Sequence, residues 1–136
     1  MEQRDSVKGM KKNFIMFFLF CILNTAFSAE GEEASWIPPS SIDPIQISNQ
    51  AVTDRLAGRF ADSLSKHVWF HEHALKLDPS LIAVRNSYAI NSWFKLCDVY
   101  PPARVKLTQT RDLAEEKVLD SDFTFFDDVV LLNTKM

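Results

Sequence analysis

The stretch VTDRLAGRFADSLSKHVWFHEHALKL, residues 52–77, decides how the first half of this chain folds. Large apolar residues recur at every fourth position of its first half, with charged residues between them, and this spacing is typical of an amphipathic helix. The apolar positions are Val52, Leu56, Phe60 and Leu64. Ser48 or Asn49 can cap the start of this helix, because either side chain can accept a hydrogen bond from a free backbone N–H.

The helical spacing continues beyond His67, so the helix is expected to run on to Leu77. Asp78-Pro79 should end it and begin another helix, since proline fits the first helical position behind an aspartate cap. The segment from Leu81 to Cys97 is apolar around more than one face, which is typical of a centrally packed helix. Tyr100-Pro101-Pro102 then stops the helix.

The pattern changes after these prolines. In residues 104–110, charged or hydroxyl side chains alternate with Val105, Leu107 and Gln109, which is the period of a half-exposed strand. Residues 112–119 suit a short helix, with a strand as the alternative, and residues 123–132 are predicted to form a strand or a strand pair. We therefore predict an α+β fold in which two or three N-terminal helices pack on a small antiparallel sheet formed by the C-terminal third.

Residues 1–28 contain the three parts of a secretory signal peptide in the expected order. Four basic residues precede an uninterrupted apolar run from Phe14 to Leu23, and small residues follow at Ala26 and Ser28. The run is about half as long as a membrane-spanning helix, which needs roughly 20 residues. We expect cleavage after Ser28 and delivery to a bacterial periplasm or to the exterior, with an uncleaved anchor as the alternative.

The remainder of the chain is predicted to be a linker and one domain. Residues 29–48 contain three prolines and several serines, which favour an extended linker. Residues 49–136 are enough for a single core. The whole chain has a formal net charge of −3, and losing the basic leader makes it more acidic. We therefore expect no nucleic acid as a partner, and no later apolar run predicts a transmembrane segment in the mature chain.

All three histidines of the chain lie close together, at His67, His71 and His73. On a helix the first two would share a face, whereas on a strand the last two would. Either arrangement supplies two ligands, so a zinc or copper site would need a third ligand such as Cys97 or Asp98. Metal binding is one hypothesis for the cluster, and an interfacial or pH-sensing role and ordinary packing are the alternatives.

Enzymatic chemistry finds little support in the sequence. Cys97 is the one cysteine that follows the leader, and its neighbours Trp93, Phe94 and Leu96 predict burial, which makes a thiol unreactive. The motifs GxSxG, CxxC and HExxH and a glycine-rich phosphate loop are all absent from the sequence. The chain is therefore more consistent with a binding protein than with an enzyme.

Three surfaces are candidates for contact with other proteins: a stiff aromatic and proline segment, a strip of small residues where a second copy could approach, and an aromatic pair. The first segment can equally pack against the domain's own core. Their residues are Trp36, Ile37, Pro38 and Pro39 for the first, Ala57, Gly58 and Ala61 for the second, and Trp69 and Phe70 for the third.

Export, small size and high aromatic content together favour a non-enzymatic accessory protein. Its partners would be other envelope proteins, for example within an envelope or secretion assembly, and a homodimer is compatible with the strip of small residues. A metal-binding protein built on the three histidines and a secreted effector or toxin are the alternative hypotheses.

Overall fold

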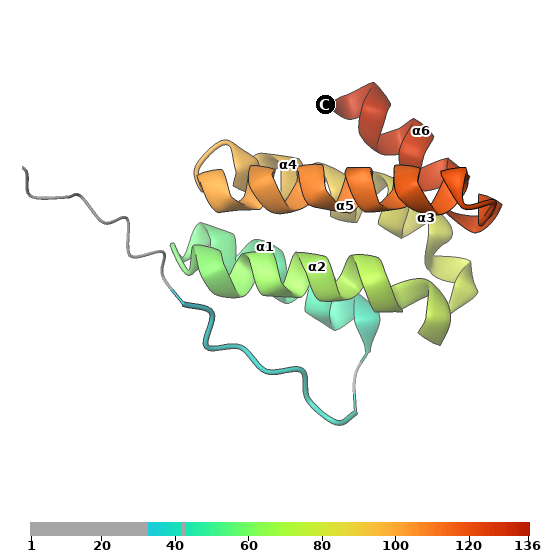
Figure 1. The fold of residues 1–136 in the computed structure, drawn as a ribbon. Coiled ribbons are helices and arrows are strands. Elements are labelled where there is room, and N and C mark those ends of the chain that lie inside the picture. The colour runs from blue at the N-terminus through green and yellow to red at the C-terminus, as the bar shows by residue number, and fades with distance from the viewer. Residues whose placement is uncertain (1–32, 42) are drawn as a thin grey trace, which may run out of the picture. The chain divides into compact units, whose positions relative to one another are not determined.

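The computed structural model describes residues 33–41 and 43–136, and every regular element in that part of the chain is helical (Figure 1). The α-helices are α1 (Pro44–Leu56), α2 (Phe60–Leu77), α3 (Ile82–Val84), α4 (Ile90–Cys97), α5 (Pro101–Leu119) and α6 (Phe126–Lys135). Two 3-10 turns, η1 (Pro79–Leu81) and η3 (Phe123–Phe125), and a π-helical segment, η2 (Arg85–Ala89), join them. The predicted signal peptide, residues 1–28, lies outside the described residues.

The predicted α+β class is wrong, because the described residues contain no strand. The segment 104–110 lies inside α5, and 123–132 forms η3 and most of α6. In α5 the buried residues Ala103, Leu107 and Ala114 are spaced by four and seven, which is the period of a helix. The alternation that suggested a strand covers too few residues to distinguish the two periods.

Two proline positions also begin helices where the sequence suggested a stop or a linker. Pro101 and Pro102 occupy the first turn of α5, where the missing N–H of proline costs no hydrogen bond. Pro44 likewise begins α1 behind Asp43, whose side chain accepts a hydrogen bond from the Ile45 N–H at 2.9 Å. The predicted linker 29–48 therefore ends earlier than expected, and Ser48 is buried within α1 and does not cap it.

A tight turn at Gly58 separates α1 from α2, so the long helix predicted across residues 52–77 is two helices. Gly58 has φ +79°, and its N–H donates to the Arg55 carbonyl at 3.2 Å. The next N–H, from Arg59, donates to the Asp54 carbonyl at 2.9 Å. This pair of bonds is a Schellman motif, in which glycine is favoured because it adopts a left-handed backbone without a steric penalty.

The helices pack as two layers around a core on the inner faces. The antiparallel neighbours α1 and α2 form one layer, and α4 and α5 form the other, while α6 packs against α5 (Figure 1). The larger cluster of buried residues joins α4, α5 and α6, and a smaller one joins α2, η1 and η2. The larger cluster consists of Ile90, Trp93, Leu96, Cys97, Ala103, Leu107 and Leu132. The segment Leu81–Cys97, predicted as one central helix, is divided among η1, α3, η2 and α4, and of these only α4 contributes to the larger cluster.

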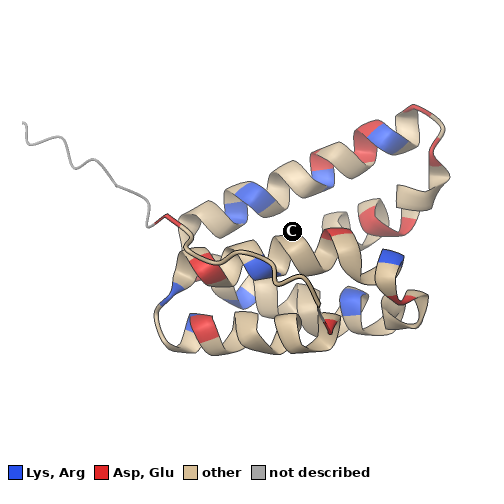
Figure 2. Cartoon of the chain, turned by 90° about the horizontal axis from the view of Figure 1, so that it is seen from below, with Lys and Arg blue, Asp and Glu red and all other residues tan. Residues whose placement is uncertain are grey.

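Residues 33–41, which we call the strap, contain no helix and lie across the α1–α2 layer (Figure 2). No helix in the described ranges is both long and apolar enough to cross a bilayer.

Candidate functional site

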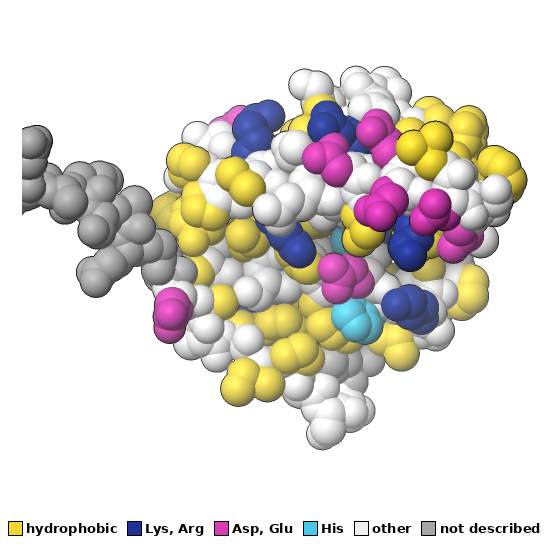
Figure 3. Space-filling model, in the orientation of Figure 1, with side chains coloured by type: hydrophobic (Ala, Val, Ile, Leu, Met, Phe, Trp, Pro, Cys, Tyr) yellow, Lys and Arg dark blue, Asp and Glu magenta, His cyan; other side chains and the backbone are white. Residues whose placement is uncertain are grey.

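Two adjacent surface hollows lie along α2 where it faces α5, and both are within the usual size of a ligand site, roughly 300–1,000 Å³. The first, which we call the Trp36 hollow, has a volume of about 440 Å³. The second, the Arg85 hollow, has a volume of about 500 Å³ and extends to η3 and α6. Glu72, His73 and Lys106 line both hollows, so the two form one groove. Figure 3 shows charged and histidine side chains gathered between the two layers on this face.

The strap is fixed to α2 by a single carboxylate. Asp62 Oδ1, in the first turn of α2, accepts hydrogen bonds from the Ser35 N–H at 2.7 Å and the Trp36 N–H at 2.8 Å. Burial acts to raise the pKa of Asp62, but these N–H groups and the Ser35 hydroxyl outweigh it and lower the pKa from its usual value. Asp62 thus satisfies two backbone N–H groups of the strap that would otherwise need water.

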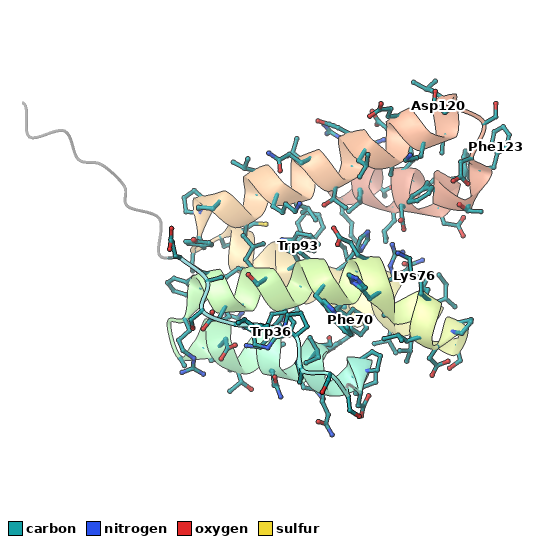
Figure 4. All side chains as sticks on the ribbon, turned by 60° about the horizontal axis from the view of Figure 1, so that its bottom comes forward. Trp36, Phe70, Lys76, Trp93, Asp120 and Phe123 are labelled. Carbon is teal, nitrogen blue, oxygen red and sulfur yellow. The ribbon has the colours of Figure 1, made fainter. Side chains whose placement is uncertain are left out.

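Trp36 packs on its own domain, as one of the two interpretations of this segment predicted. Its ring meets the ring of Trp69 edge-on, with centroids 6.4 Å apart and planes at 80°. The Lys66 ammonium lies 5.2 Å from the centroid of the Trp36 ring, within cation–π distance. Figure 4 shows Trp36 beside α2. Of its strap neighbours, Pro38 lines the Trp36 hollow, whereas Ile37 and Pro39 are exposed.

Lys66 is held in place from below by α1. It is buried and forms an ion pair with Asp54, which also binds Arg59 at 2.5 Å. A second link is the hydrogen bond that the buried Ser63 hydroxyl donates to the Ala51 carbonyl at 2.7 Å. These contacts between α1 and α2 give the cation a fixed position beneath the tryptophan.

His73 and Trp69 form the aromatic wall of the Trp36 hollow. Their rings stack with centroids 5.0 Å apart and planes at 7°. His73 Nδ1 lies 2.9 Å from the Trp69 carbonyl oxygen. Since a carbonyl can only accept a hydrogen bond, Nδ1 carries the proton, and Nε2 is left for other partners. Leu64 and Val68 add apolar surface to this hollow.

A buried ion pair closes the inner side of the Arg85 hollow. Arg85 begins the π-helical segment and binds Asp128 of α6 through two bonds, Nη1–Oδ1 at 2.5 Å and Nη2–Oδ2 at 2.7 Å. Its other donors reach the His71 carbonyl at 2.9 Å, His71 Nε2 at 2.9 Å and Asn86 Oδ1 at 3.3 Å. All five guanidinium N–H groups therefore have partners, and the side chain is a structural clamp between α2, η2 and α6.

The ion pair also controls the charge of Asp128. Burial alone would raise the pKa of this carboxyl, but the neighbouring His71 and the hydrogen-bonded Arg85 guanidinium hold the pKa well below its usual range. The 3.6 Å between His71 Nε2 and Asp128 Oδ2 is too long for a hydrogen bond, so we assign most of the lowering to Arg85.

The three histidines do not form one cluster in space. His67 is buried, and its ring stacks on Trp93 with centroids 6.0 Å apart and planes at 10°. His71 meets the same tryptophan edge-on and binds Arg85 at the edge of the Arg85 hollow, whereas His73 stacks on Trp69 and lines both hollows. Among the described residues, no three histidine, cysteine or carboxylate side chains are grouped so that they could hold a metal ion. The described residues therefore provide no set of ligands for the predicted zinc or copper site.

Other predicted site residues have structural roles. Cys97 is buried, as predicted, and burial raises the pKa of its thiol. Phe70 is buried in the core, so it is not part of a surface pair with Trp69. Ala57 and Gly58 are exposed in the α1–α2 turn, and Ala61 is buried in α2, so these small residues do not form one strip on a helix.

Sequence reasoning found Trp36, Trp69 and His73 but missed the charged residues of the groove. Arg85 and Asp128 are 43 residues apart, and no motif links them. Glu72 and Lys106 resemble ordinary exposed helix positions in the sequence. Their role depends on the packing of α5 against the earlier helices, for which periodicity gives no signal.

Comparisons of the chain with known protein families, with curated proteins and with solved structures found no match.

Proposed function

We propose that this chain is an exported, non-enzymatic accessory protein that binds an extended segment of a partner protein in the groove between α2 and α5. The observation that carries the proposal is the Trp36 hollow, an open recess with apolar and aromatic walls and two opposite charges at one end. Apolar recesses with a few polar groups are the usual form of a binding site. The leader sequence supports export.

The strap supports the choice of an extended partner. The face of α2 already binds one extended segment, through backbone N–H groups on Asp62 and an aromatic ring between Trp69 and Lys66. A partner segment with an aromatic or proline residue would find similar surfaces in the hollow beside it. From Leu64 to Lys76 the groove follows about 18 Å of helix, which accommodates roughly five extended residues.

The charges at the centre of the groove support a polypeptide partner as well. Glu72 and Lys106 line both hollows, and neither forms an ion pair within the described residues. Opposite charges on the partner would pair with them and fix its register. His73 adds a ring nitrogen that is free to bond.

Site-specific cross-linking tests this proposal. A photo-reactive residue would replace Ser65, which lines the Trp36 hollow, and in a control protein it would replace Gln50, which is exposed on α1. Illumination in the cells that produce the protein should give a discrete adduct from position 65 alone. Equal labelling from both positions, or none from position 65, would contradict the proposal.

A charge reversal provides the second measurement. Lys106→Glu should weaken capture of the cross-linked partner about tenfold, since one favourable pairing becomes repulsive. Because Lys106 is partly exposed, the melting temperature should change little. Asp98→Lys, at an exposed position outside the groove, is the matched control and should leave capture unchanged.

A further inference from the structure

A second surface lies at the turn between α5 and α6, away from the Trp36 hollow. Four large apolar side chains are exposed there within twelve residues of chain, and we call this surface the α5–α6 knob. They are Leu119 at 84%, Phe123 at 69%, Phe126 at 53% and Val130 at 49% exposure. Single exposed apolar residues are normal, but a group of this kind marks a contact surface. Hydrophobic side chains gather at this end of the molecule in Figure 3.

Acidic residues surround the knob. Glu116, Asp120, Asp122 and Asp127 are all exposed, and none forms an ion pair with another described residue. Figure 2 shows acidic positions near the turn that ends α5. Two of them oppose helix stability, because Glu116 and Asp120 lie at the C-terminal end of α5, where the helix dipole favours positive charge. Stability of α5 therefore does not explain these two carboxylates, whereas Asp122 caps η3 by accepting a hydrogen bond from the Thr124 N–H at 3.2 Å and Asp127 lies in the first turn of α6, where the helix dipole favours negative charge.

The knob has a fixed backbone. Ser121 has φ 71°, a left-handed conformation that side chains other than glycine rarely adopt. The Asp122 N–H donates to the Lys117 carbonyl at 2.9 Å, and the Ser121 N–H donates to the Val118 carbonyl at 3.0 Å. These two bonds complete a Schellman motif, and the buried Arg85–Asp128 pair anchors α6. The exposed phenylalanines are thus presented from a defined turn.

From these observations we infer that the α5–α6 knob docks a basic amphipathic helix of a partner protein. The exposed phenylalanines match the apolar stripe of such a helix, and the acidic rim matches the lysines or arginines that flank it. The knob adjoins the Arg85 hollow, which Asp127 also lines, but it shares no lining residue with the Trp36 hollow. The inference therefore goes beyond the proposed function: with both surfaces occupied, the protein would connect two partners. The acidic rim also makes an anionic membrane surface an unfavourable alternative.

The test uses a synthetic peptide of leucine and lysine, about four helical turns long, whose leucines form one stripe. A second peptide carries glutamate in place of lysine. Titration calorimetry with the purified protein should detect binding of the lysine peptide, and the affinity should fall as salt is added. The glutamate peptide should show no binding. The double variant Phe123→Ser/Phe126→Ser should weaken binding at least about tenfold, as loss of central aromatic anchors usually does.

A second pair of substitutions tests the charges without touching the apolar surface. Glu116→Gln/Asp120→Asn should weaken lysine-peptide binding several-fold and reduce its salt dependence. Leu56→Ser and Asp98→Asn are matched controls, because these residues are also exposed but lie outside the knob. Both controls should bind the peptide as the unaltered protein does.

Several outcomes would overturn the inference. Equal binding of both peptides, loss of binding in the controls, or unchanged binding by both double variants would each show that the knob does not recognise a basic helix. Sedimentation that finds a dimer which the phenylalanine variant disrupts would assign the surface to a second copy of the chain. Lys106→Glu should leave peptide binding unchanged, so failure of the groove proposal remains distinguishable from failure of this one.

Discussion

Acid should destabilise this protein through His67, starting well above the pH at which carboxylates titrate. The ring is buried against Trp93, and its Nε2 has no hydrogen-bond partner among the residues that the structure describes. Burial, with a smaller contribution from the charge of Arg55, lowers the pKa of His67 from 6.5 to about 3. The folded protein therefore keeps this histidine neutral at pH values where the unfolded chain binds a proton. Stability from this residue is complete above pH 6.5 and is lost as the pH falls toward 3.

The size of the effect follows from linkage. Between pH 7 and pH 5 the unfolded chain protonates at its ordinary pKa, while the folded protein does not, which costs about 2 kcal/mol of unfolding free energy. This loss is a large fraction of the stability of a small domain, about 5–15 kcal/mol. Urea unfolding at several pH values, followed by tryptophan fluorescence, would measure it.

A substitution that keeps an aromatic ring at position 67 but removes its titratable nitrogens isolates the contribution of His67 to the pH dependence of stability. His67→Phe should retain the stacking on Trp93. The unfolding free energy that the protein loses between pH 7 and pH 5 should become smaller by about 2 kcal/mol. Ile90→Val is the control, because it removes one buried methyl group, lowers stability by roughly 1 kcal/mol at every pH and leaves the slope intact. Equal slopes for the unaltered protein and His67→Phe would refute the reasoning.

Three further predictions concern the buried ion pair, the two left-handed turns and the strap. Asp128→Ala should destabilise the fold by about 3–5 kcal/mol in urea unfolding, because it leaves Arg85 buried without a counter-charge, and Arg85→Met/Asp128→Leu should recover most of the loss. Gly58→Ala should cost about 1 kcal/mol and Ser121→Gly should gain about 0.5 kcal/mol in thermal melts, since both positions have a left-handed backbone. Trp36→Ala should remove about 1–2 kcal/mol and make the strap more sensitive to protease, through loss of its contacts with Trp69 and Lys66.

Helical structure in the first half was predictable, but the single helix and its apolar stripe were wrong, because the chain turns at Gly58 and Leu56 is 73% exposed. The aspartate cap before Pro79 was correct, whereas the predicted helix Leu81–Cys97 contributes to the larger cluster only through α4. The errors arose where one local signal has two meanings. Proline ends one helix and begins the next equally well, so Pro101 was interpreted as a stop although it opens α5. A few alternating residues after it fit either period, and only packing on the core decides between them.

The site was predictable in part for similar reasons. Aromatic residues such as Trp36 and Trp69 are natural candidates for contact sites in a sequence, because buried or partly buried rings contribute much of the packing energy. The proximity of three histidines in sequence, by contrast, was a poor guide: His67 and His71, one turn apart, both pack on Trp93, whereas His73, two residues further on, lies on another face and stacks on Trp69. Arg85 and Asp128 are 43 residues apart and meet only in the folded chain, and no neighbouring residue in the sequence indicates the pair.

Buried and exposed charges differ in this protein in a way that bears on function. The buried cations Lys66 and Arg85 each have a carboxylate partner and link separate helices. At the surface, the groove and the knob keep charged groups unpaired beside apolar side chains, within the part of the chain that the structure describes. Stability alone would favour pairing the charges or covering the phenylalanines. A rigid interior with two unsatisfied surfaces is the arrangement expected when partners supply the missing contacts.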